Sequence, residues 1–595
     1  MFEFHLGLLT CSGVHQAAFS HSYHESAQCI GHFCIQLSIL ENAQHTQNGQ
    51  SQCSECQNQI RYTCSIHFAC KSNKKKRADI WLARFFYLFL QLDMITDELK
   101  YRIREKFGLT PTMEQEKAID CFARFMTDRD ENVVMVLRGA AGTGKTSLSA
   151  AIVQALLSLG QKLVLLAPTG RAAKVFSLYS GHAAYTIHRR IYRQKSLEGS
   201  FELNYNSDQD TLFMVDEASM IANASNYGDT IFAGGQLMDD LISFVYNGRN
   251  PFHSSASKSR HCRLMLIGDH AQLPPVGETD SPALQGEVLR GYGLKVYESN
   301  LSEVLRQSQE SGILWNATRI RGEGLEAREE VTALPKIRFE GFKDIRNVPG
   351  DELIEQLASS YSKVGTDDTL VVTRSNKRAN IYNQGIRNKV LDCEDELCSG
   401  DQIMVVKNNY FWWRVEGGGL KAPSSLLLPP STFIANGDRA VVRRVRHVHE
   451  QYGFRFADVT MTFPDYNDYE LTATVLLDTL TSEAPALTRE QQESLYNKVM
   501  EDYADISQKQ ERVKKVREDK YFNALQVKFA YAATCHKAQG GQWAHVYVDQ
   551  GYMTDDMLTP DYLHWLYTAF TRATEQLYLV NWPKTQTDEC PFPNP

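Results

Sequence analysis

The sequence lacks any uninterrupted apolar run of the roughly 18 residues that a membrane-spanning helix needs. Its best candidate, residues 80–92, is shorter and contains Arg84. The sequence also lacks a charged start, an apolar core and a small-residue cleavage pattern in the order of a secretory signal. The 63 basic and 71 acidic residues give a net charge of −8, which excludes a polybasic coat protein but permits a locally basic groove. We therefore expect a soluble protein with no membrane partner.

Cysteine is scarce beyond the first 70 residues. Seven of the 13 cysteines lie within that stretch, and the other six are scattered over the rest of the 595 residues. Scattered thiols in a large chain are typical of reduced, intracellular proteins. We therefore expect reduced cysteines and a cytoplasmic location.

Residues 1–93 permit two interpretations. A zinc site would use thiolates and a histidine at irregular spacing: Cys53, Cys56, Cys64 and either His67 or Cys70. Alternatively, this segment is an extension that is poorly ordered or precedes the natural start, because it shows no regular periodicity and Met94 opens a well-patterned helix. We favour the extension.

A phosphate-binding loop opens the patterned part of the chain. Residues 133–137 form an apolar, β-branched run typical of a buried strand, and residues 147–160 have a helical pattern. Between them stands GAAGTGKT, which matches the P-loop pattern G-x-x-x-x-G-K-[ST] in its strand–loop–helix context. Its backbone amides would cradle phosphate oxygens, Lys145 would reach the β and γ phosphates, and Thr146 would bind Mg²⁺. The predicted cradle consists of Gly139, Ala140, Ala141, Gly142, Thr143, Gly144, Lys145 and Thr146.

Two adjacent acids follow a second apolar strand. Asp216 and Glu217 come directly after residues 212–215. Metal-assisted phosphoryl transfer needs one carboxylate to hold Mg²⁺ and another to polarise the attacking water. We assign the first role to Asp216 and the second to Glu217.

The order of further blocks resembles superfamily 1 helicases, specifically the RecD-like branch that translocates 5′→3′. The resemblance covers about residues 105–582, and Cys535 departs from the family's usual apolar β-branched residue. Eight blocks carry it besides the P-loop: Gln115 in TMEQEKAI, APTGRAA at 167–173, TIH at 186–188, DEAS at 216–219, GDHAQLPPV at 268–276, LSEVLRQ at 301–307, YAATCHKAQG at 531–540 and YTAFTRA at 567–573.

The resemblance implies roles for single residues. Gln115 would read the adenine of ATP, and Gln272 would sense its γ-phosphate. Arg306 and Arg572 would supply positive charge during hydrolysis, beside Lys145 and Glu217. Two grips would hold single-stranded DNA: Pro168, Thr169, Thr186 and His188 in the first lobe, and Asn376, Thr534 and His536 in the second.

We predict an α/β fold of two RecA-like parallel-sheet lobes, with a small β-hairpin wedge and an inserted SH3-like β-barrel that carries a helical excursion. Apolar strands at residues 133–137, 162–167, 212–215 and 264–267 alternate with helical patterns in the first lobe, as parallel sheets require, and alternating residues near 454–476 indicate an antiparallel barrel. The expected parts are 94–300 for the first lobe with the wedge at about 189–211, 301–400 and 523–595 for the second lobe, 401–522 for the insertion, and 488–520 for its helices.

The resemblance implies an ATP-dependent, Mg²⁺-requiring DNA helicase. It would be a monomer that moves 5′→3′ on single-stranded DNA, unwinds duplex at a fork, acts in DNA repair and recombination and associates with the nucleoid. RNA is not excluded as a substrate, and a nuclease or a single-strand-binding protein is a candidate partner. Two alternatives stay open: the motor subunit of a RecBCD-like helicase–nuclease complex, and a nucleotide-switched nucleic-acid-binding module that does not unwind.

Overall fold

The computed structural model describes residues 94–194, 201–223, 236–246, 261–304, 310–325, 333–409, 411–412, 434–466 and 468–588. Both hypotheses for residues 1–93 therefore lie outside the described residues. Residues 90–595 form one compact unit. Among the described residues, none of the helices combines the length and the apolar content that a membrane span requires.

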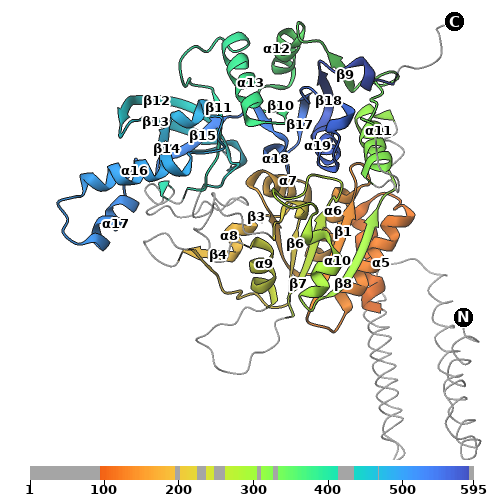
Figure 1. Ribbon diagram of the computed structural model, residues 1–595. Helices are drawn as coiled ribbons and strands as arrows, with labels where there is room; N and C mark the ends of the chain where they lie inside the picture. Colours follow the sequence, from red (N-terminus) through yellow and green to blue (C-terminus); the bar gives the residue numbers. More distant parts are fainter. Residues whose placement is uncertain are drawn as a thin grey trace, which may run out of the picture. The chain divides into compact units, whose positions relative to one another are not determined.

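The first lobe is built on a six-stranded parallel sheet (Figure 1). Its order is β3-β2-β6-β7-β1-β8. The sequence predicted four of these strands, but it did not predict β3, which has three residues, or β8, whose polar edge sequence KVYESNL lacks an apolar run. The strands are β1 (Val133–Gly139), β2 (Lys162–Ala167), β3 (Ala184–Thr186), β6 (Thr211–Val215), β7 (Arg263–Gly268) and β8 (Lys295–Leu301).

The packing of residues 133–137 in β1 explains why this run is wholly apolar. Val133, Met135 and Leu137 pack into one core, whereas Val134 and Val136 pack into another. Both faces of the sheet are thus covered by helices, as parallel sheets require. Residues 94–107 are helical, and the other helices are α5 (Met113–Thr127), α6 (Lys145–Ser158), α7 (Gly170–Ser180), α8 (Ile187–Ile191), α9 (Leu237–Tyr246) and α10 (Gly286–Gly291).

The predicted wedge hairpin is present as two short antiparallel strands, β4 (Tyr192–Gln194) and β5 (Phe201–Leu203). The turn expected near residues 198–200 lies outside the described residues. At the base of the hairpin, Arg190 forms an ion pair with Asp208, and the Arg189 guanidinium lies 4.8 Å from the centroid of the Tyr185 ring.

The second lobe contains a five-stranded parallel sheet in the order β16-β10-β17-β18-β9. Its strands are β9 (Ile345–Val348), β10 (Thr369–Thr373), β16 (Ala532–Thr534), β17 (Trp543–Asp549) and β18 (Ala573–Val580). Its helices are α11 (Gly312–Arg319), which continues into the π-helical turn η4 (Ile320–Leu325), α12 (Leu353–Val364), α13 (Asn376–Lys389), α18 (Cys535–Ala538) and α19 (Pro560–Phe570).

A closed five-stranded barrel interrupts this lobe, as predicted. Alternate residues of its strands point inward, so Val459, Met461 and Ala473 share one core. The barrel strands are β11 (Gln402–Val405), β12 (Arg439–Gln451), β13 (Phe454–Phe463), β14 (Tyr469–Leu476) and β15 (Leu525–Phe529). Four of the pairings are antiparallel, as predicted, but β14 and β15 pair in parallel. After the short α15 (Asp478–Thr481), the helices α16 (Arg489–Asp502) and α17 (Lys509–Arg517) pack on residues at the start of β13.

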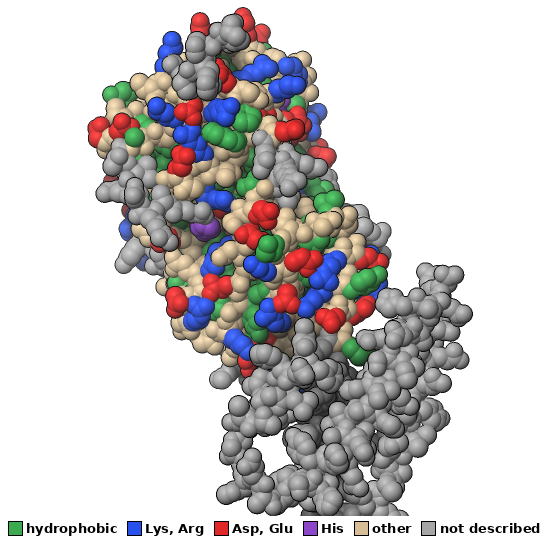
Figure 2. Space-filling model, turned by 90° about the vertical axis from the view of Figure 1, so that its right-hand side faces the viewer, with side chains coloured by type: hydrophobic (Ala, Val, Ile, Leu, Met, Phe, Trp, Pro, Cys, Tyr) green, Lys and Arg blue, Asp and Glu red, His purple; other side chains and the backbone are tan. Residues whose placement is uncertain are grey.

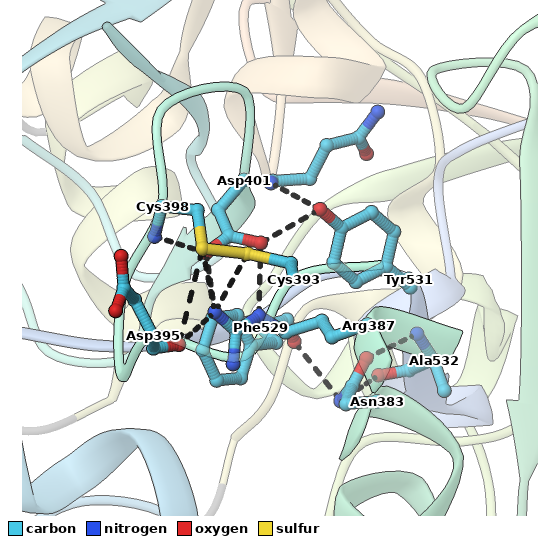
Figure 3. A network of polar contacts seen from close by, with 10 residues as sticks. Asn383, Arg387, Cys393, Asp395, Cys398, Asp401, Phe529, Tyr531 and Ala532 are labelled. Carbon is cyan, nitrogen blue, oxygen red and sulfur yellow. Dashed lines mark hydrogen bonds and ion pairs between the residues drawn. A yellow bond between two sulfur atoms is a disulfide. The ribbon is translucent and has the colours of Figure 1, made fainter. Parts of the chain in front are cut away.

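The chain leaves the second lobe between α13 and β11 and returns after β15, and a buried polar network joins these two crossings (Figure 3). Arg387 of α13 binds both carboxylate oxygens of Asp401, at 2.9 and 3.0 Å. The Tyr531 hydroxyl, on the returning segment, donates to Asp401 at 3.0 Å. Because all three side chains are at most 2% exposed, the network fixes the barrel to the lobe without contact with bulk water.

The expectation that the scattered cysteines are all reduced is wrong at one pair. Cys393 and Cys398 lie in the loop between α13 and β11 and form a disulfide (Figure 3). The expectation came from the uneven spacing of cysteine over the whole chain, which does not reveal that a tight loop brings two of them together. The other described cysteines, Cys121, Cys262 and Cys535, are not in disulfides.

We predict that Asp401→Asn destabilises the protein strongly. The substitution leaves the Arg387 charge buried without its counter-ion, which costs about 3–5 kcal/mol in comparable cases. Urea denaturation should show the loss as a lower transition midpoint. The matched control is Lys377→Ala, which removes an ion pair to Glu483 at 3.2 Å whose two side chains are 69% and 65% exposed. Its effect should stay within about 1 kcal/mol, and equal losses in both variants would contradict the prediction.

Candidate functional site

The P-loop joins β1 to α6 at the carboxyl edge of the first sheet. Gly142 and Gly144 adopt positive φ angles of 78° and 77°, a conformation that residues with a Cβ rarely adopt. This curl directs backbone amides and the amino end of α6 into the concavity of the loop. The Lys145 ammonium donates to the Gly139 carbonyl at 3.1 Å, so it lies over the loop.

The side chain of Gln115 supports the backbone of the P-loop. Its side chain is 1% exposed, its Nε2 donates to the Thr143 carbonyl at 2.9 Å, and its Oε1 accepts from the Thr112 amide at 2.9 Å. Thr112 in turn caps α5. The amide of Gln115 is therefore engaged within the protein, and its predicted contact with adenine stays a prediction.

The two acids after β6 have different surroundings. Asp216 accepts from the Glu217 amide at 2.9 Å through Oδ1, and the Tyr179 hydroxyl of α7 donates to its Oδ2. Glu217 has a φ of 52°, which is strained for a residue with a side chain. Its Oε2 is buried and has no hydrogen-bond partner among the described residues. The strained backbone thus presents a carboxylate oxygen that the protein itself leaves unsatisfied.

Glu217 is also the electrostatic centre of the site. Burial raises the pKa of this carboxyl, whereas the positive charges of Arg572 and Lys145 lower it and the negative charges of Asp216 and Asp269 raise it. Arg572 belongs to the second lobe, yet its charge acts on an acid of the first lobe. Its guanidinium is 3% exposed and donates to neutral oxygens only, those of Thr568, Gly541 and Thr571, at 3.1–3.2 Å. No carboxylate among the described residues neutralises Arg572 by an ion pair.

The loop after β7 connects the two lobes directly. The Leu273 amide donates to the Thr568 hydroxyl of α19 at 2.8 Å, and the Gln539 side chain donates to the Leu273 carbonyl at 2.7 Å. His564 of α19 lies 2.9 Å from the Ala271 carbonyl. Beside these contacts, Gln272 is 4% exposed, and its Oε1 has no partner among the described residues.

Tyr567 of α19 connects the two lobes through two hydrogen bonds of its hydroxyl. Its hydroxyl accepts from the P-loop amide of Ala141 at 2.9 Å and donates to Asp269 at 2.7 Å. One phenol from the second lobe therefore touches both the phosphate cradle and the loop that carries Gln272. Tyr567 is the first residue of the block YTAFTRA, but the resemblance gave it no role.

The first predicted DNA grip lies where β2 and β3 end. These strands pair Ala167 with Thr186, so Pro168 and Thr169 stand beside Thr186 at one edge of the sheet. The Thr169 and Thr186 hydroxyls cap α7 and α8, accepting backbone amides at 3.2 and 3.3 Å. His188 packs against the Tyr192 ring at 5.6 Å, and burial lowers its pKa to about 4. The imidazole is therefore neutral near pH 7, so it can contact a nucleic acid by stacking or hydrogen bonding but not as a cation.

The second predicted grip lies in the same relation to its own sheet. Strands β10 and β16 pair Thr373 with Thr534, and Asn376 begins α13 three residues after Thr373. Thr534 precedes α18, where its side chain makes no capping bond, and His536 is exposed. The residues of each predicted grip thus follow the carboxyl ends of an edge strand and of its neighbour, at equivalent places in the two sheets.

Residues beside the two predicted grips are in contact across the boundary between the lobes. Gly540, with a φ of 75°, lies so close to the first lobe that an added Cβ would be 3.2 Å from the Thr169 hydroxyl and 3.1 Å from the Ala172 Cβ. Next to it, Arg171 donates to the Gln542 carbonyl at 2.7 Å and stacks 4.4 Å from the centroid of the Trp543 ring. Arg439 of the barrel lies 5.7 Å from the same ring centroid.

The structure brings together most, but not all, of the predicted site residues. Arg306 lies outside the described residues, so its role stays a prediction. Sequence reasoning missed Tyr179, Tyr567 and Gln539. The latter two lie in the recognised blocks, where their position was the available signal, whereas Tyr179 gives no signal because a tyrosine on an amphipathic helix is ordinarily core or surface.

The residues present fit a nucleoside triphosphate and Mg²⁺. The P-loop offers curled amides and a lysine, and the buried oxygens of Glu217 and Gln272 lack partners among the described residues. Asp216 and Thr146 have the oxygen donors that Mg²⁺ prefers. The one cluster of described residues whose donor atoms could together hold a metal within the protein is elsewhere, at Cys393, Cys398 and Asp401.

Figure 2 shows one face of the molecule, on which basic and acidic side chains are interspersed. The face drawn there carries no continuous basic coat among the described residues. On this face, the described residues therefore offer a nucleic acid no extended positive surface.

Comparison with known proteins agrees with this arrangement. Residues 112–226 match the AAA domain family, and residues 529–580 match the family described as UvrD-like helicase C-terminal domain. The first match covers the P-loop and the acids after β6, and the second covers the blocks that contain Thr534 and Arg572.

Two curated relatives of the chain are described as DNA helicases. The chain is 32% identical over 149 residues to the ATP-dependent RecD2 DNA helicase of Deinococcus radiodurans, covering 24% of this chain and 16% of that protein. It is 24% identical over 315 residues to the ATP-dependent DNA helicase dda of Enterobacteria phage T4, covering 51% and 63%. A crystal structure of Pif1 helicase from Bacteroides, in complex with ADP-AlF3 and ssDNA, is 15% identical with a TM-score of 0.39, covering 80% and 94%.

The chain thus spans less than two thirds of the length of these two curated relatives. Together the sequence matches confirm the predicted resemblance to superfamily 1 helicases of the RecD-like branch.

We predict that Tyr567→Phe weakens communication between the lobes without weakening nucleotide binding. The variant loses two hydrogen bonds across the boundary, but it leaves the Ala141 amide free to bind phosphate. DNA-stimulated ATP hydrolysis should fall about tenfold in kcat, equivalent to about 1.4 kcal/mol, with little change in nucleotide Kd.

The matched control is Tyr562→Phe on the same helix, whose hydroxyl donates to Gln550 within the second lobe at 2.5 Å. It should keep DNA-stimulated hydrolysis near the parental value. A common loss in both variants would mean that the effect comes from α19 itself and not from the contact between the lobes.

Proposed function

We propose that this protein is an ATP-dependent DNA helicase that moves 5′→3′ along single-stranded DNA and unwinds duplex at a fork. The observation that carries the proposal is the position of Arg572. A buried arginine of the second lobe acts electrostatically on Glu217 of the first lobe, at the mouth of a P-loop. A protein that binds nucleotide without hydrolysing it has no need for a cation from a second lobe beside Glu217.

In this proposal the first lobe binds the nucleotide. Lys145 and the amides of the P-loop hold the phosphates, Thr146 and Asp216 hold Mg²⁺, and Glu217 orients the attacking water. The metal supplies neutralisation of the charge that develops on the phosphate oxygens. The raised pKa of Glu217 suits a group that accepts a proton from water during the reaction.

The second lobe completes the site. Arg572 stabilises negative charge on the transferred phosphoryl group, with Arg306 as a second arginine. Gln272 senses the γ-phosphate from a loop that is hydrogen-bonded to α19, which gives hydrolysis a direct route to the second lobe. Gln115 remains the proposed adenine contact, through the amide hydrogen that Thr143 does not use.

The two grips turn hydrolysis into movement. One grip comprises Pro168, Thr169, Thr186 and His188, and the other comprises Asn376, Thr534 and His536. Because each is attached to a different sheet, a change in the separation of the lobes changes the distance between the grips. Alternate holding and release then moves the protein along a strand, and the hairpin of β4 and β5 meets the duplex.

The same chemistry suits the motor subunit of a helicase–nuclease assembly, and this is the second candidate. A single-strand-binding protein or a nuclease is the proposed partner, RNA is the alternative substrate, and DNA repair or recombination in the cytoplasm at the nucleoid is the proposed setting.

We predict that Lys145→Ala and Arg572→Ala each abolish DNA-stimulated ATP hydrolysis while single-stranded DNA binding survives. The first removes the cation on the phosphates, and the second removes the positive charge that the second lobe delivers. Steady-state hydrolysis and fluorescence anisotropy with a labelled oligonucleotide measure the two properties. Arg124→Ala is the control, because its side chain is 66% exposed and, among the described residues, forms an ion pair with Asp120 of its own helix alone. Unchanged turnover in either site variant would refute the assignment.

We predict strand displacement only from substrates with a 5′ single-stranded tail. Duplexes with 5′ tails, 3′ tails and blunt ends should be compared at equal ATP and Mg²⁺ concentrations. Displacement from the 3′ tail alone would overturn the polarity. Slow hydrolysis that no nucleic acid stimulates, with no displacement, would instead support a nucleotide-switched binding module.

A further inference from the structure

A disulfide stands at the junction between the second lobe and the barrel, apart from the proposed nucleotide and DNA sites. Cys393 and Cys398 are five residues apart in the loop between α13 and β11 (Figure 3). Both are half-buried, whereas Asp392, Glu394 and Asp395 around them are exposed. A small thiol or disulfide can therefore approach the sulfur atoms from solvent.

The loop is attached to both members of the buried ion pair. The Cys393 amide donates to the Arg387 carbonyl at 2.9 Å, and the Cys398 amide donates to Asp401 at 2.7 Å. Arg387 also donates to the Asp395 carbonyl at 2.6 Å, between the two cysteines. The disulfide thus closes a short loop whose backbone satisfies the pair that fixes the barrel to the lobe.

The charges around the sulfur atoms favour a disulfide over a metal site. Cys393, Cys398 and Asp401 have donor atoms within 4.8 Å of one another, as a metal would need. However, both oxygens of Asp401 already bind Arg387, whose guanidinium also lies 3.2 Å from the Cys393 sulfur and 3.5 Å from the Cys398 sulfur. A divalent cation would have to displace a buried arginine, whereas an uncharged disulfide leaves the ion pair intact.

We propose that Cys393 and Cys398 form a thiol–disulfide exchange site that reacts with small thiols and disulfides and, when oxidised, clamps the barrel to the second lobe. In oxidation, the thiolate of one cysteine attacks a small disulfide RSSR, forming a mixed disulfide and releasing RS⁻. The thiolate of the other cysteine attacks the protein sulfur of that mixed disulfide, closing the Cys393–Cys398 bond and releasing a second RS⁻. The two cysteines lose two electrons, RSSR gains them, and the cysteine protons pass through solvent to the two RS⁻ ions.

The exposed carboxylates give the site a preference among reagents. Asp392, Glu394 and Asp395 carry negative charge beside the sulfur atoms, and Glu396 is an acid that is paired with Arg455. Thiols and disulfides of positive charge are therefore attracted to this loop and those of negative charge are repelled. Exchange should be faster with cystamine and cysteamine than with the anionic glutathione pair, and the difference should shrink at high salt.

The test follows the redox state of each cysteine in the full chain. The protein is incubated in cysteamine/cystamine or glutathione buffers of varied ratio, quenched and differentially alkylated, and peptides are counted by mass spectrometry. We expect Cys393 and Cys398 to pass together from dithiol to disulfide as the ratio changes, several-fold faster with the cationic pair at low salt and at nearly equal rates in 1 M salt. Cys121, Cys262 and Cys535, which are not in disulfides, are internal controls that should not form disulfides with one another.

A second measurement tests the clamp. The oxidised protein should have a higher thermal midpoint than the reduced protein, and Cys393→Ser and Cys398→Ser should each remove that dependence on redox state. Three results would overturn the proposal: a pair that stays dithiol at every ratio, a disulfide that cysteamine cannot reduce in the native protein, or stoichiometric zinc bound by the reduced pair. A redox-dependent midpoint that persists in both serine variants would place the effect at other cysteines and would also overturn it.

Discussion

The contact between Tyr567 and the P-loop is the constraint on which the rest of the proposed machine depends. Its hydroxyl joins the Ala141 amide to Asp269, and through Asp269 it supports the loop that carries Gln272. Parallel sheets place their loops at one edge, and each lobe turns that edge toward the other. A phosphate cradle, a sensing loop and a helix of the opposite lobe can then share hydrogen bonds in a small volume. A change at the cradle must alter these bonds, because buried polar groups tolerate few unsatisfied partners.

The barrel is an insertion that does not disturb this contact. It leaves and re-enters the second lobe through one buried network, so that the two crossings are held by Arg387, Asp401 and Tyr531. The parallel pairing of β10 with β16 continues directly after the return. The chain can therefore carry the 128 additional residues from Gln402 to Phe529 while Thr534 stays beside Thr373, as the second grip requires.

The sequence predicted the elements whose physical cause is local. A wholly apolar run such as residues 133–137 can only be a strand buried on two faces, and GAAGTGKT needs curled backbone whatever surrounds it. The barrel followed from alternation in residues 454–463. The structure has all of these elements, and the comparisons confirm the resemblance that joined the blocks. Residue roles at the site have not been tested by either and remain proposals.

The features that the sequence did not predict depend on contacts with residues that are distant in the chain. Residues 295–301 look polar because β8 is an edge strand, and the roles of Tyr179 and Tyr567 exist only because Asp216 and the P-loop lie opposite them. The disulfide was missed for a similar reason, since its two cysteines meet only when the loop folds back on Arg387. Gln115 is the opposite case. The sequence assigned it to adenine, and in the structure it also supports the neighbouring P-loop by donating to the Thr143 carbonyl.

Trp543 lies where three parts of the protein meet. Arg171 of the first lobe and Arg439 of the barrel both approach its ring, and the indole is 3% exposed. If the lobes separate, the indole loses one of these cations and gains solvent, which shifts tryptophan emission toward longer wavelengths. Trp543 therefore provides an intrinsic fluorescence signal for separation of the lobes, without an attached dye.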